Sequence, residues 1–328
     1  MRDRTVLDRV TARNRSANGL RYGPRVRSTS VTTDRSAQTG VLLALLAALL
    51  WGVSGAVAAG VFAEVSPARV VEMRALMTTA VLVPYAWWRG RLAPGGNLRW
   101  YALLGLNLAV VNVTFYWAID LLGVGPGATI QFLGPILVLG WMVAVQHRKV
   151  ASAAWFAAIL AVIGVALVTE AWNLDGSDWL GVAAGLASAV TFASYLLLAE
   201  HFGRRRPVVT VMTWSFIFAS LFWVIVQPLW TFPTDLALGT WGQLVWIAIA
   251  GTAIPFLAEF NALKRVSAGV VGVIATTEPV IGAAAAWVLL EQHLSGVQIV
   301  GGAMVLLAVA SIQRWGLPRR EVPLDAAR

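Results

Sequence analysis

Long apolar stretches, separated by short polar loops, follow one another from residue 36 to residue 313. A transmembrane helix needs about 20 predominantly apolar residues, and eight stretches reach that length without any Asp, Glu, Lys or Arg. They are residues 36–63, 100–119, 121–147, 150–169, 179–199, 207–234, 236–258 and 292–313. Two further stretches, 67–88 and 268–290, are equally long but contain charged residues. The pattern predicts an all-α integral membrane protein with ten transmembrane helices.

Two parts of this pattern repeat one another. Residues 118–147 and 262–291 align without a gap at a spacing of 144 residues. The identical pairs are Ala118 and Ala262, Gly125 and Gly269, Ile130 and Ile274, and Pro135 and Pro279. Duplicated transporter halves with broken helices place their binding site between the halves, near the bilayer midplane. We therefore expect two five-helix repeats, at residues 39–170 and 171–316.

Basic residues are unevenly distributed among the loops, and this bias sets the orientation of a membrane protein. With a cytoplasmic N-terminus, most of the 25 Lys and Arg lie on the cytoplasmic side, and only Lys264 and Arg265 fall in an expected outer loop. Both termini are therefore expected in the cytoplasm. Residues 1–38 form an expected disordered basic tail, or else Met1 lies upstream of the true translation start, and residues 317–328 form a second cytoplasmic tail.

Composition narrows the function further. The chain is 58% hydrophobic and 12% charged, whereas soluble domains are about 25% charged. Its net charge of +9 is concentrated on the expected cytoplasmic face, where acidic lipids attract it, so nucleic acid is not an expected partner. Cysteine is absent and the three histidines share no ligand spacing, so we expect no metal site and no cofactor. No nucleophile–base pair or phosphate-binding glycine loop appears, so we do not expect an enzyme.

Ionisable side chains inside a membrane helix are expensive and mark functional sites by default. Glu278 is the strongest candidate, because it lies within an apolar stretch directly before Pro279, which cannot donate a backbone hydrogen bond. The corresponding polar residue in the first repeat is Gln131, close before Pro135. A neutral amide there replaces the charge, so the halves are chemically unequal. Each of the two polar residues either contacts substrate or joins neighbouring helices.

Further polar residues lie in other stretches. Glu259 follows Pro255 and either serves as a proton or amine site or reaches an interfacial partner. Asn112 either binds a ligand or joins helices through its amide. Arg74 is deep enough to need an acidic partner, for which Glu259 and Glu278 are the candidates. We expect Arg74 in a buried ion pair, with binding of a substrate carboxylate as the alternative.

Several short strings, in a fixed order, carry a family resemblance. They are Trp51-Gly52, Arg74-Ala75-Leu76, residues 112–119 (NVTFYWAI), 131–135 (QFLGP), 251–263 (GTAIPFLAEFNAL) and 277–279 (TEP), followed by Glu291. Over roughly residues 39–316 the chain resembles the EamA-type permeases of the drug/metabolite transporter superfamily, including the threonine/homoserine exporters. The resemblance implies an inverted-repeat bundle with a central cavity, alternating access, and export of amino acids, metabolites or drugs. Gln131 and Phe192 depart from it, because the exporters carry a glutamate and a tryptophan there.

We therefore expect a secondary transporter of a bacterial plasma membrane that exports small amino acids or related metabolites. Its partners would be a small-molecule substrate, the lipid bilayer and coupled protons, and the sequence carries no signal for an oligomeric state. The expected substrate-binding residues are Trp51, Asn112, Tyr116, Gln131, Tyr195, Glu259 and Glu278, with hinges at Pro135, Pro255 and Pro279. The aromatic members of this set either bind substrate or pack in the core.

The main alternative is a broad-specificity efflux pump for drugs or quaternary ammonium compounds, whose aromatic side chains would enclose a cation. An intramembrane enzyme acting on lipids would need converging nucleophile, base or metal groups, which the sequence does not show. A purely structural scaffold would carry the costly buried residues Glu278 and Arg74 without using them.

Overall fold

The computed structural model describes residues 30–62, 64–122, 124–172, 179–290, 293–312 and 314. Every regular element in this part of the chain is helical. The expected tail at 317–328 and residues 1–29 of the expected N-terminal tail lie outside it. The first helix begins at Ser30, eight residues before the expected end of that tail. The described residues from Ser36 onward form one structural unit.

The helices fall into three groups along the chain. The first repeat region contains α1 (Ser30–Val61), α2 (Pro67–Trp88), α3 (Leu98–Leu122), α4 (Val124–Gln131), α5 (Gly134–Ala144) and α6 (Ser152–Val168). The middle contains α7 (Trp179–Arg205), α8 (Val208–Val226), the 3-10 turn η1 (Leu229–Thr231) and α9 (Leu238–Ala248). The last group contains the π-helix η2 (Ile249–Ala253), α10 (Ile254–Leu263), α11 (Ala268–Ala275), α12 (Thr277–Leu290) and α13 (Gly296–Ser311).

The lengths of these elements suit a membrane. Seven helical segments of the described chain are long and apolar enough to cross a bilayer, and α6 and α13 are shorter apolar helices. The 22-residue α2 carries Arg69, Glu72 and Arg74 near its start. Large apolar side chains such as Leu42 and Ile225 are exposed on the helices. Such a surface suits lipid, because hydrocarbon does not penalise apolar groups as water does.

Local sequence explains where individual helices begin and end. Pro67 starts α2, at a position where a missing N–H costs nothing. Ser295 caps α13, because its hydroxyl accepts a hydrogen bond from the Gln298 N–H while the Gln298 side chain accepts one from the Ser295 N–H. The helix expected over 207–234 ends earlier, at Val226, since Pro228 cannot extend it.

Three apolar stretches are interrupted in the middle. The first divides into α4 and α5 around Phe132 and Leu133, and the second into α11 and α12 at Thr276. The third contains the π-helix η2 between α9 and α10, directly before Pro255. Non-helical turns in a membrane bundle expose backbone carbonyls and are tolerated where protein buries them. These interruptions are thus the places where polar chemistry can enter the bundle.

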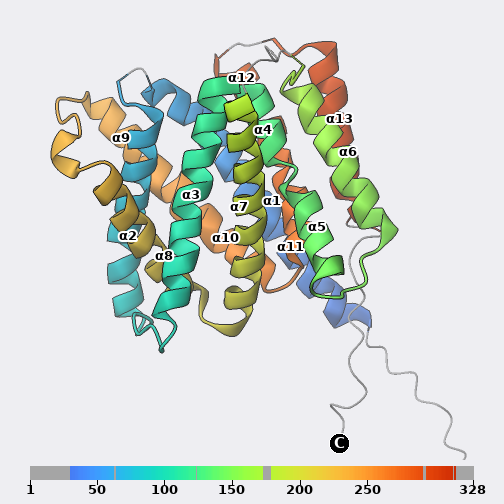
Figure 1. The fold of residues 1–328 in the computed structure, drawn as a ribbon, viewed down its shortest axis with the longest axis horizontal. Coiled ribbons are helices and arrows are strands. Elements are labelled where there is room, and N and C mark those ends of the chain that lie inside the picture. The colour runs from blue at the N-terminus through green and yellow to red at the C-terminus, as the bar shows by residue number, and fades with distance from the viewer. Residues whose placement is uncertain are drawn as a thin grey trace, which may run out of the picture. The chain divides into compact units, whose positions relative to one another are not determined.

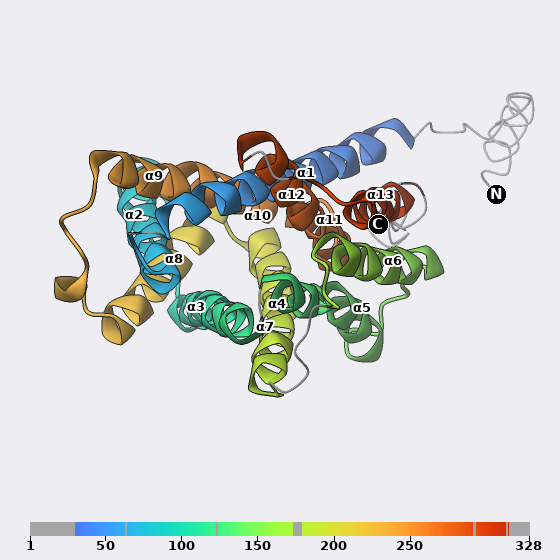
Figure 2. The ribbon, with the colours of Figure 1, turned by 90° about the horizontal axis from the view of Figure 1, so that it is seen from above.

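Figure 1 shows the helices of this unit running side by side, and Figure 2 shows their order when the view is turned by 90°. The closest neighbours include α6 with α13, α3 with α7, and α2 with α8. The first pair approaches most tightly at two glycines: a Cβ on Gly164 would lie 2.8 Å from the Gly301 carbonyl oxygen, and a Cβ on Gly301 2.6 Å from that of Gly164. Small residues allow such close helix packing in membranes.

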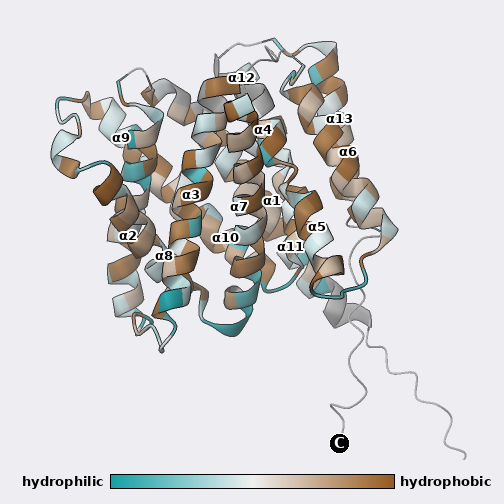
Figure 3. Cartoon of the chain, in the orientation of Figure 1, coloured by the Kyte–Doolittle hydropathy of each residue, from teal (hydrophilic) through white to brown (hydrophobic). Residues whose placement is uncertain are grey.

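The loops at one end of the bundle are basic. Figure 3 shows hydrophilic residues at the helix ends, including the turn after α7. Arg204 in that region donates from Nε to the Leu263 carbonyl at 2.9 Å and from Nη2 to the Val266 carbonyl at 3.1 Å. The loop containing Lys264 therefore lies at the same end as Arg204.

This arrangement corrects one expectation. Lys264 and Arg265 were expected in an outer loop, opposite the other loop cations. The contacts of Arg204 show that this expectation was wrong. The reason is the order of the stretches along the chain. Counted from a cytoplasmic N-terminus, the stretch that ends with the helix carrying Glu259 is the eighth and so ends on the cytoplasmic side, which puts the loop after Leu263 at the basic end.

Candidate functional site

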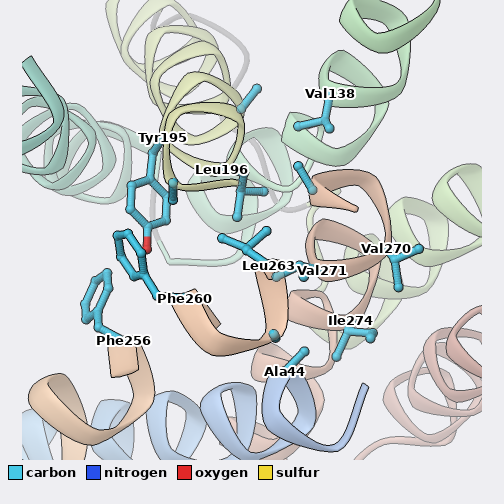
Figure 4. Packing of buried hydrophobic residues seen from close by; sticks show 14 of the residues in the cluster. Ala44, Val138, Tyr195, Leu196, Phe256, Phe260, Leu263, Val270, Val271 and Ile274 are labelled. Atoms are coloured by element: carbon cyan, nitrogen blue, oxygen red, sulfur yellow. The ribbon is translucent and has the colours of Figure 1, made fainter. Parts of the chain in front are cut away.

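Phe256 of α10 is the centre of a group of aromatic side chains from four helices. Its ring centroid lies 5.1 Å from Trp51 of α1, 5.3 Å from Phe216 of α8 and 6.0 Å from Tyr195 of α7, each in an edge-to-face arrangement. Figure 4 shows the rings of Tyr195, Phe256 and Phe260 gathered between α7 and α10. Two of the predicted substrate-binding residues, Trp51 and Tyr195, are therefore joined through a third side chain that was not predicted.

A tyrosine–glutamate pair lies beside this aromatic group. The Tyr195 hydroxyl donates a hydrogen bond to Glu259 Oε2. Both side chains are almost completely buried, at 2% and 1% exposure. Glu259 Oε1 is buried and has no hydrogen-bond partner among the described residues. A buried carboxyl oxygen without a donor is costly, which makes it a candidate for holding a proton or meeting a ligand.

Arg74 of α2 is held by the π-helix η2. Its Nε donates to Thr252 Oγ1 at 2.9 Å, and its Nη2 donates to the Gly251 carbonyl at 3.3 Å. Thr252 Oγ1 in turn donates to the Ile247 carbonyl at 2.8 Å. The irregular backbone before Pro255 therefore supplies acceptors to a guanidinium inside the bundle, as half-helix ends and unwound carbonyls do in transporters.

A small cavity of about 30 Å³ lies where α2, α3, α8 and α10 meet. It is lined by Val71, Arg74, Ala75, Leu108, Asn112, Phe216, Ala219, Trp223, Thr252 and Phe256. Asn112 Nδ2 donates to the Leu108 carbonyl one turn earlier, at 2.6 Å. The cavity thus brings predicted Asn112 and Arg74 together with Thr252 and Phe256, and the rest of its wall is apolar.

Glu278 lies in the first turn of α12 and is half-buried. Its carboxylate interacts electrostatically with Arg74 and with Glu259. α1 approaches this turn closely, because a Cβ on Gly52 would lie 2.9 Å from the Glu278 carbonyl oxygen and 2.8 Å from Ile281 Cγ2. One cation and two carboxylates are therefore close enough to interact inside the bundle.

Gln131, at the end of α4, has a different environment. Ser188 of α7 donates a hydrogen bond to Gln131 Oε1 at 2.5 Å. Gln131 does not line the small cavity. The side chain of Tyr116, which was also predicted to bind substrate, lies outside the described part of the structure.

The three predicted hinge prolines occupy similar local positions. Pro135 lies in the first turn of α5 and Pro255 in the first turn of α10. Pro279 lies at the third position of α12. In each case the chain departs from the α-helix immediately before the proline-containing turn, where a missing N–H would otherwise break the hydrogen-bond series.

Thr252, Phe256 and Ser188 were not predicted as site residues. The first two fall within the string GTAIPFLAEFNAL, spaced four residues apart around Pro255. A polar and an aromatic residue one turn apart share a helix face, and this spacing was the available signal. Nothing near Ser188 in the sequence distinguishes it from other small helix residues.

Known proteins resemble this chain along most of its length. The EamA-like transporter family matches residues 38–170 and 179–313. The threonine/homoserine exporter RhtA of Salmonella typhimurium (strain SL1344) is 28% identical over 273 residues, covering 81% of this chain and 89% of that protein. RhtA of Escherichia coli (strain K12) is 26% identical over 277 residues, covering 83% and 90%.

More distantly related proteins also match over most of this chain. Protein PecM of Dickeya dadantii (strain 3937) is 23% identical over 275 residues, covering 82% of this chain and 91% of that protein. A solved crystal structure with 19% identity gives a TM-score of 0.73, covering 84% of this chain and 96% of that chain, which shows a shared fold. The family match extends over most of the sequence in two copies, so this chain belongs to the EamA-like transporter family and is a multi-pass membrane transporter.

Proposed function

We propose that this protein is a secondary transporter that exports small amino acids or related metabolites from the cytoplasm by alternating access. Its ten transmembrane helices would form two inverted repeats, with the broken segments α4–α5 and α11–α12 at equivalent positions. The RhtA proteins, which are named as threonine/homoserine exporters, support this substrate class.

The observation that carries the proposal is the arrangement of charge around Phe256. Arg74 lies on the cavity wall. The Glu278 carboxylate is attracted to Arg74 and repels the carboxylate of Glu259. An amino acid zwitterion has one carboxylate and one ammonium group. A guanidinium matches the carboxylate through paired N–H donors, and a buried carboxylate matches the ammonium. The centre of the bundle therefore offers complementary partners for both groups.

The cavity is too small for an amino acid in this conformation. Its volume is about 30 Å³, which is about the share of one water molecule in the liquid. Substrate would therefore enter only when neighbouring helices separate. The interruptions before Pro135, Pro255 and Pro279 would serve as hinges for that separation, since backbone changes concentrate at element ends.

Glu259 is the proposed proton site. Its Oε1 has no hydrogen-bond partner among the described residues, while Tyr195 donates to Oε2. Proton relays in transporters use such intramembrane carboxyl groups. Protonation of Glu259 when substrate leaves would couple export to proton movement in the opposite direction.

The orientation follows from the basic end of the bundle. Loop cations after α2, α7 and α10 line one hollow there, and cytoplasmic loops of membrane proteins are rich in Lys and Arg. We therefore place this end, and both termini, in the cytoplasm of a bacterium, with the helices in the plasma membrane.

A second candidate is export of hydrophobic cations such as quaternary ammonium drugs. The edge-to-face group of Trp51, Tyr195, Phe216 and Phe256 beside two carboxylates favours it. Aromatic rings bind such cations without any need for a guanidinium. Arg74 would oppose a cation in the same cavity, so the amino acid remains our proposal.

Efflux from proteoliposomes tests the proposal. Vesicles would be preloaded with radiolabelled threonine, homoserine, an aromatic amino acid, or a quaternary ammonium compound, and efflux followed with and without a pH gradient. We expect efflux of at least one amino acid above that of protein-free vesicles. Efflux of the quaternary ammonium compound alone would establish the second candidate instead.

A further inference from the structure

A second, larger hollow lies at the basic end of the bundle, away from the aromatic group. It has a volume of about 530 Å³ and opens to the surface. Its lining residues come from the end of α2, the α7–α8 junction and the end of α10: Tyr85, Arg89, Arg91, Arg204, Arg205, Arg206, Pro207, Val208, Val209, Leu257, Asn261 and Lys264. We refer to this hollow as the basic groove.

The groove contains six basic side chains and no acidic one. Arg204 is paired with Glu200, at 3.1 Å. Among the described residues, none of the other five cations forms an ion pair with a carboxylate: Arg89, Arg91, Arg205, Arg206 and Lys264. Burial, followed by the neighbouring Arg265, lowers the pKa of the Lys264 amine from its usual value. Cations that repel one another in a shared hollow gain stability from an added anion.

The walls of the groove are fixed by hydrogen bonds between distant segments. Thr210 Oγ1 donates to the Arg91 carbonyl, and Trp214 Nε1 donates to the Leu92 carbonyl, both at 2.7 Å. Arg204 ties the end of α10 to α7 through the Leu263 carbonyl. These hydrogen bonds hold together the loop after α2, the start of α8 and the ends of α7 and α10, so the backbone segments that carry the cations of the groove are fixed relative to one another.

The rim of the groove has the character of a membrane interface. The Arg89 guanidinium lies 5.7 Å from the ring of Trp88 and 6.0 Å from that of Tyr85. Trp88 is 73% exposed. Tryptophan and tyrosine gather at the level of lipid headgroups, so the groove opens at the depth where phosphate groups lie.

We propose that the basic groove binds a phosphate group, supplied either by an acidic phospholipid headgroup or by a soluble phosphate ester. Guanidinium groups bind phosphate oxygens through paired N–H donors. Basic pockets between transmembrane helices on the cytoplasmic side bind acidic headgroups in other proteins. Leu257 and Asn261 of α10, with Lys264 directly after it, form one wall, so a bound phosphate contacts the helix that carries Glu259.

Binding to the full-length protein in neutral detergent tests the proposal. The probe is fluorescently labelled phosphatidylglycerol, followed by polarisation, with labelled phosphatidylcholine as the zwitterionic comparison. The test variant is Arg91→Gln/Arg206→Gln. Its matched control is Arg99→Gln/Lys149→Gln, which removes the same charge from exposed positions outside the groove. Thermal unfolding of each variant checks that it is folded.

We expect phosphatidylglycerol to bind the wild type and the control similarly, and the groove variant on the order of ten-fold more weakly. Competition by glycerol 3-phosphate identifies a soluble phosphate ester as a sufficient ligand. Binding of the lipid without such competition identifies the phospholipid as the source. Equal weakening in both double variants would show general attraction of cations to acidic lipid and would overturn the proposal, as would equal binding of phosphatidylcholine.

Discussion

The two broken helices of this transporter share a backbone design and differ in chemistry. α4 (Val124–Gln131) and α11 (Ala268–Ala275) begin and end at positions 144 residues apart, and each is followed by a break and a proline. At the first break, a neutral amide accepts a hydrogen bond from Ser188. At the second, a carboxylate interacts with Arg74 and Glu259. The duplication has kept the interruption in both halves but the charge in only one.

The difference has a physical consequence. A neutral amide inside a membrane bundle is satisfied by a single hydroxyl from the next helix. The Glu278 carboxylate, just after the second break, needs a cation, a proton or a ligand. We therefore propose that Gln131 joins helices and that Glu278 binds substrate or a proton.

The strongest test of this assignment is Glu278→Gln, which makes the second break neutral like the first. We expect efflux to fall by about 100-fold, because interactions with a charged partner contribute roughly 1.5–3 kcal/mol. Proteoliposome efflux measures the loss, and Gln131→Asn is the companion variant. Efflux by the Glu278→Gln variant at the wild-type rate would show that Glu278 contributes only to helix packing.

The variant Arg74→Lys tests whether a positive charge alone is sufficient to bind the substrate carboxylate. A lysine cannot reproduce the forked contacts with Thr252 and the Gly251 carbonyl. We expect about ten-fold weaker apparent affinity for amino acid, since an ammonium binds a carboxylate less specifically than a guanidinium does. The concentration dependence of efflux measures it. An unchanged affinity would mean that Arg74 only balances the carboxylates.

Tyr195→Phe removes the hydroxyl that donates to Glu259 and keeps the aromatic contacts with Phe256. We expect about five-fold slower proton-coupled efflux, because one hydrogen bond worth about 1 kcal/mol is lost. Efflux driven by a substrate gradient alone should change less. If both rates fall equally, the hydroxyl has no particular role in coupling.

The smallest effect is expected at the first break. Ser188→Ala removes the hydrogen bond to Gln131, which should lower the free energy of unfolding by about 0.6 kcal/mol. Thermal unfolding in detergent measures this change, and efflux should stay within about two-fold of the wild type. A large loss of efflux with an unchanged free energy of unfolding would show that the first break takes part directly in transport.

Much of the fold could be predicted from the sequence. Apolar runs located the helices, and the ungapped alignment at 144 residues located the two breaks, because identical prolines impose the same loss of an N–H. The extent of α2 was predicted at both ends. The end of α10 was not predicted, because the uncharged run stops at residue 258, directly before Glu259, whose partner Tyr195 comes from a distant helix.

The candidate site could be predicted in part. Arg74, Glu259 and Glu278 were predicted because charge is expensive inside a membrane, and Trp51, Asn112 and Tyr195 because they are polar or amphipathic residues within apolar stretches. Thr252 and Phe256 were missed, since hydroxyl and aromatic residues are common in membrane helices and become distinctive only through the groups that they contact. The basic groove was hidden for a similar reason: its cations are far apart in sequence and meet only in the folded bundle.

The central claim is that transport requires a carboxylate at the second break, where Glu278 lies. The direct test is a swapped protein, Gln131→Glu/Glu278→Gln, compared with the wild type by amino acid efflux from proteoliposomes. The swap keeps the net charge and the two side-chain types but moves the carboxylate to the side of Ser188. We predict that the folded double variant transports no better than Glu278→Gln. Efflux restored to the wild-type rate would contradict the claim and show that either break can hold the working carboxylate.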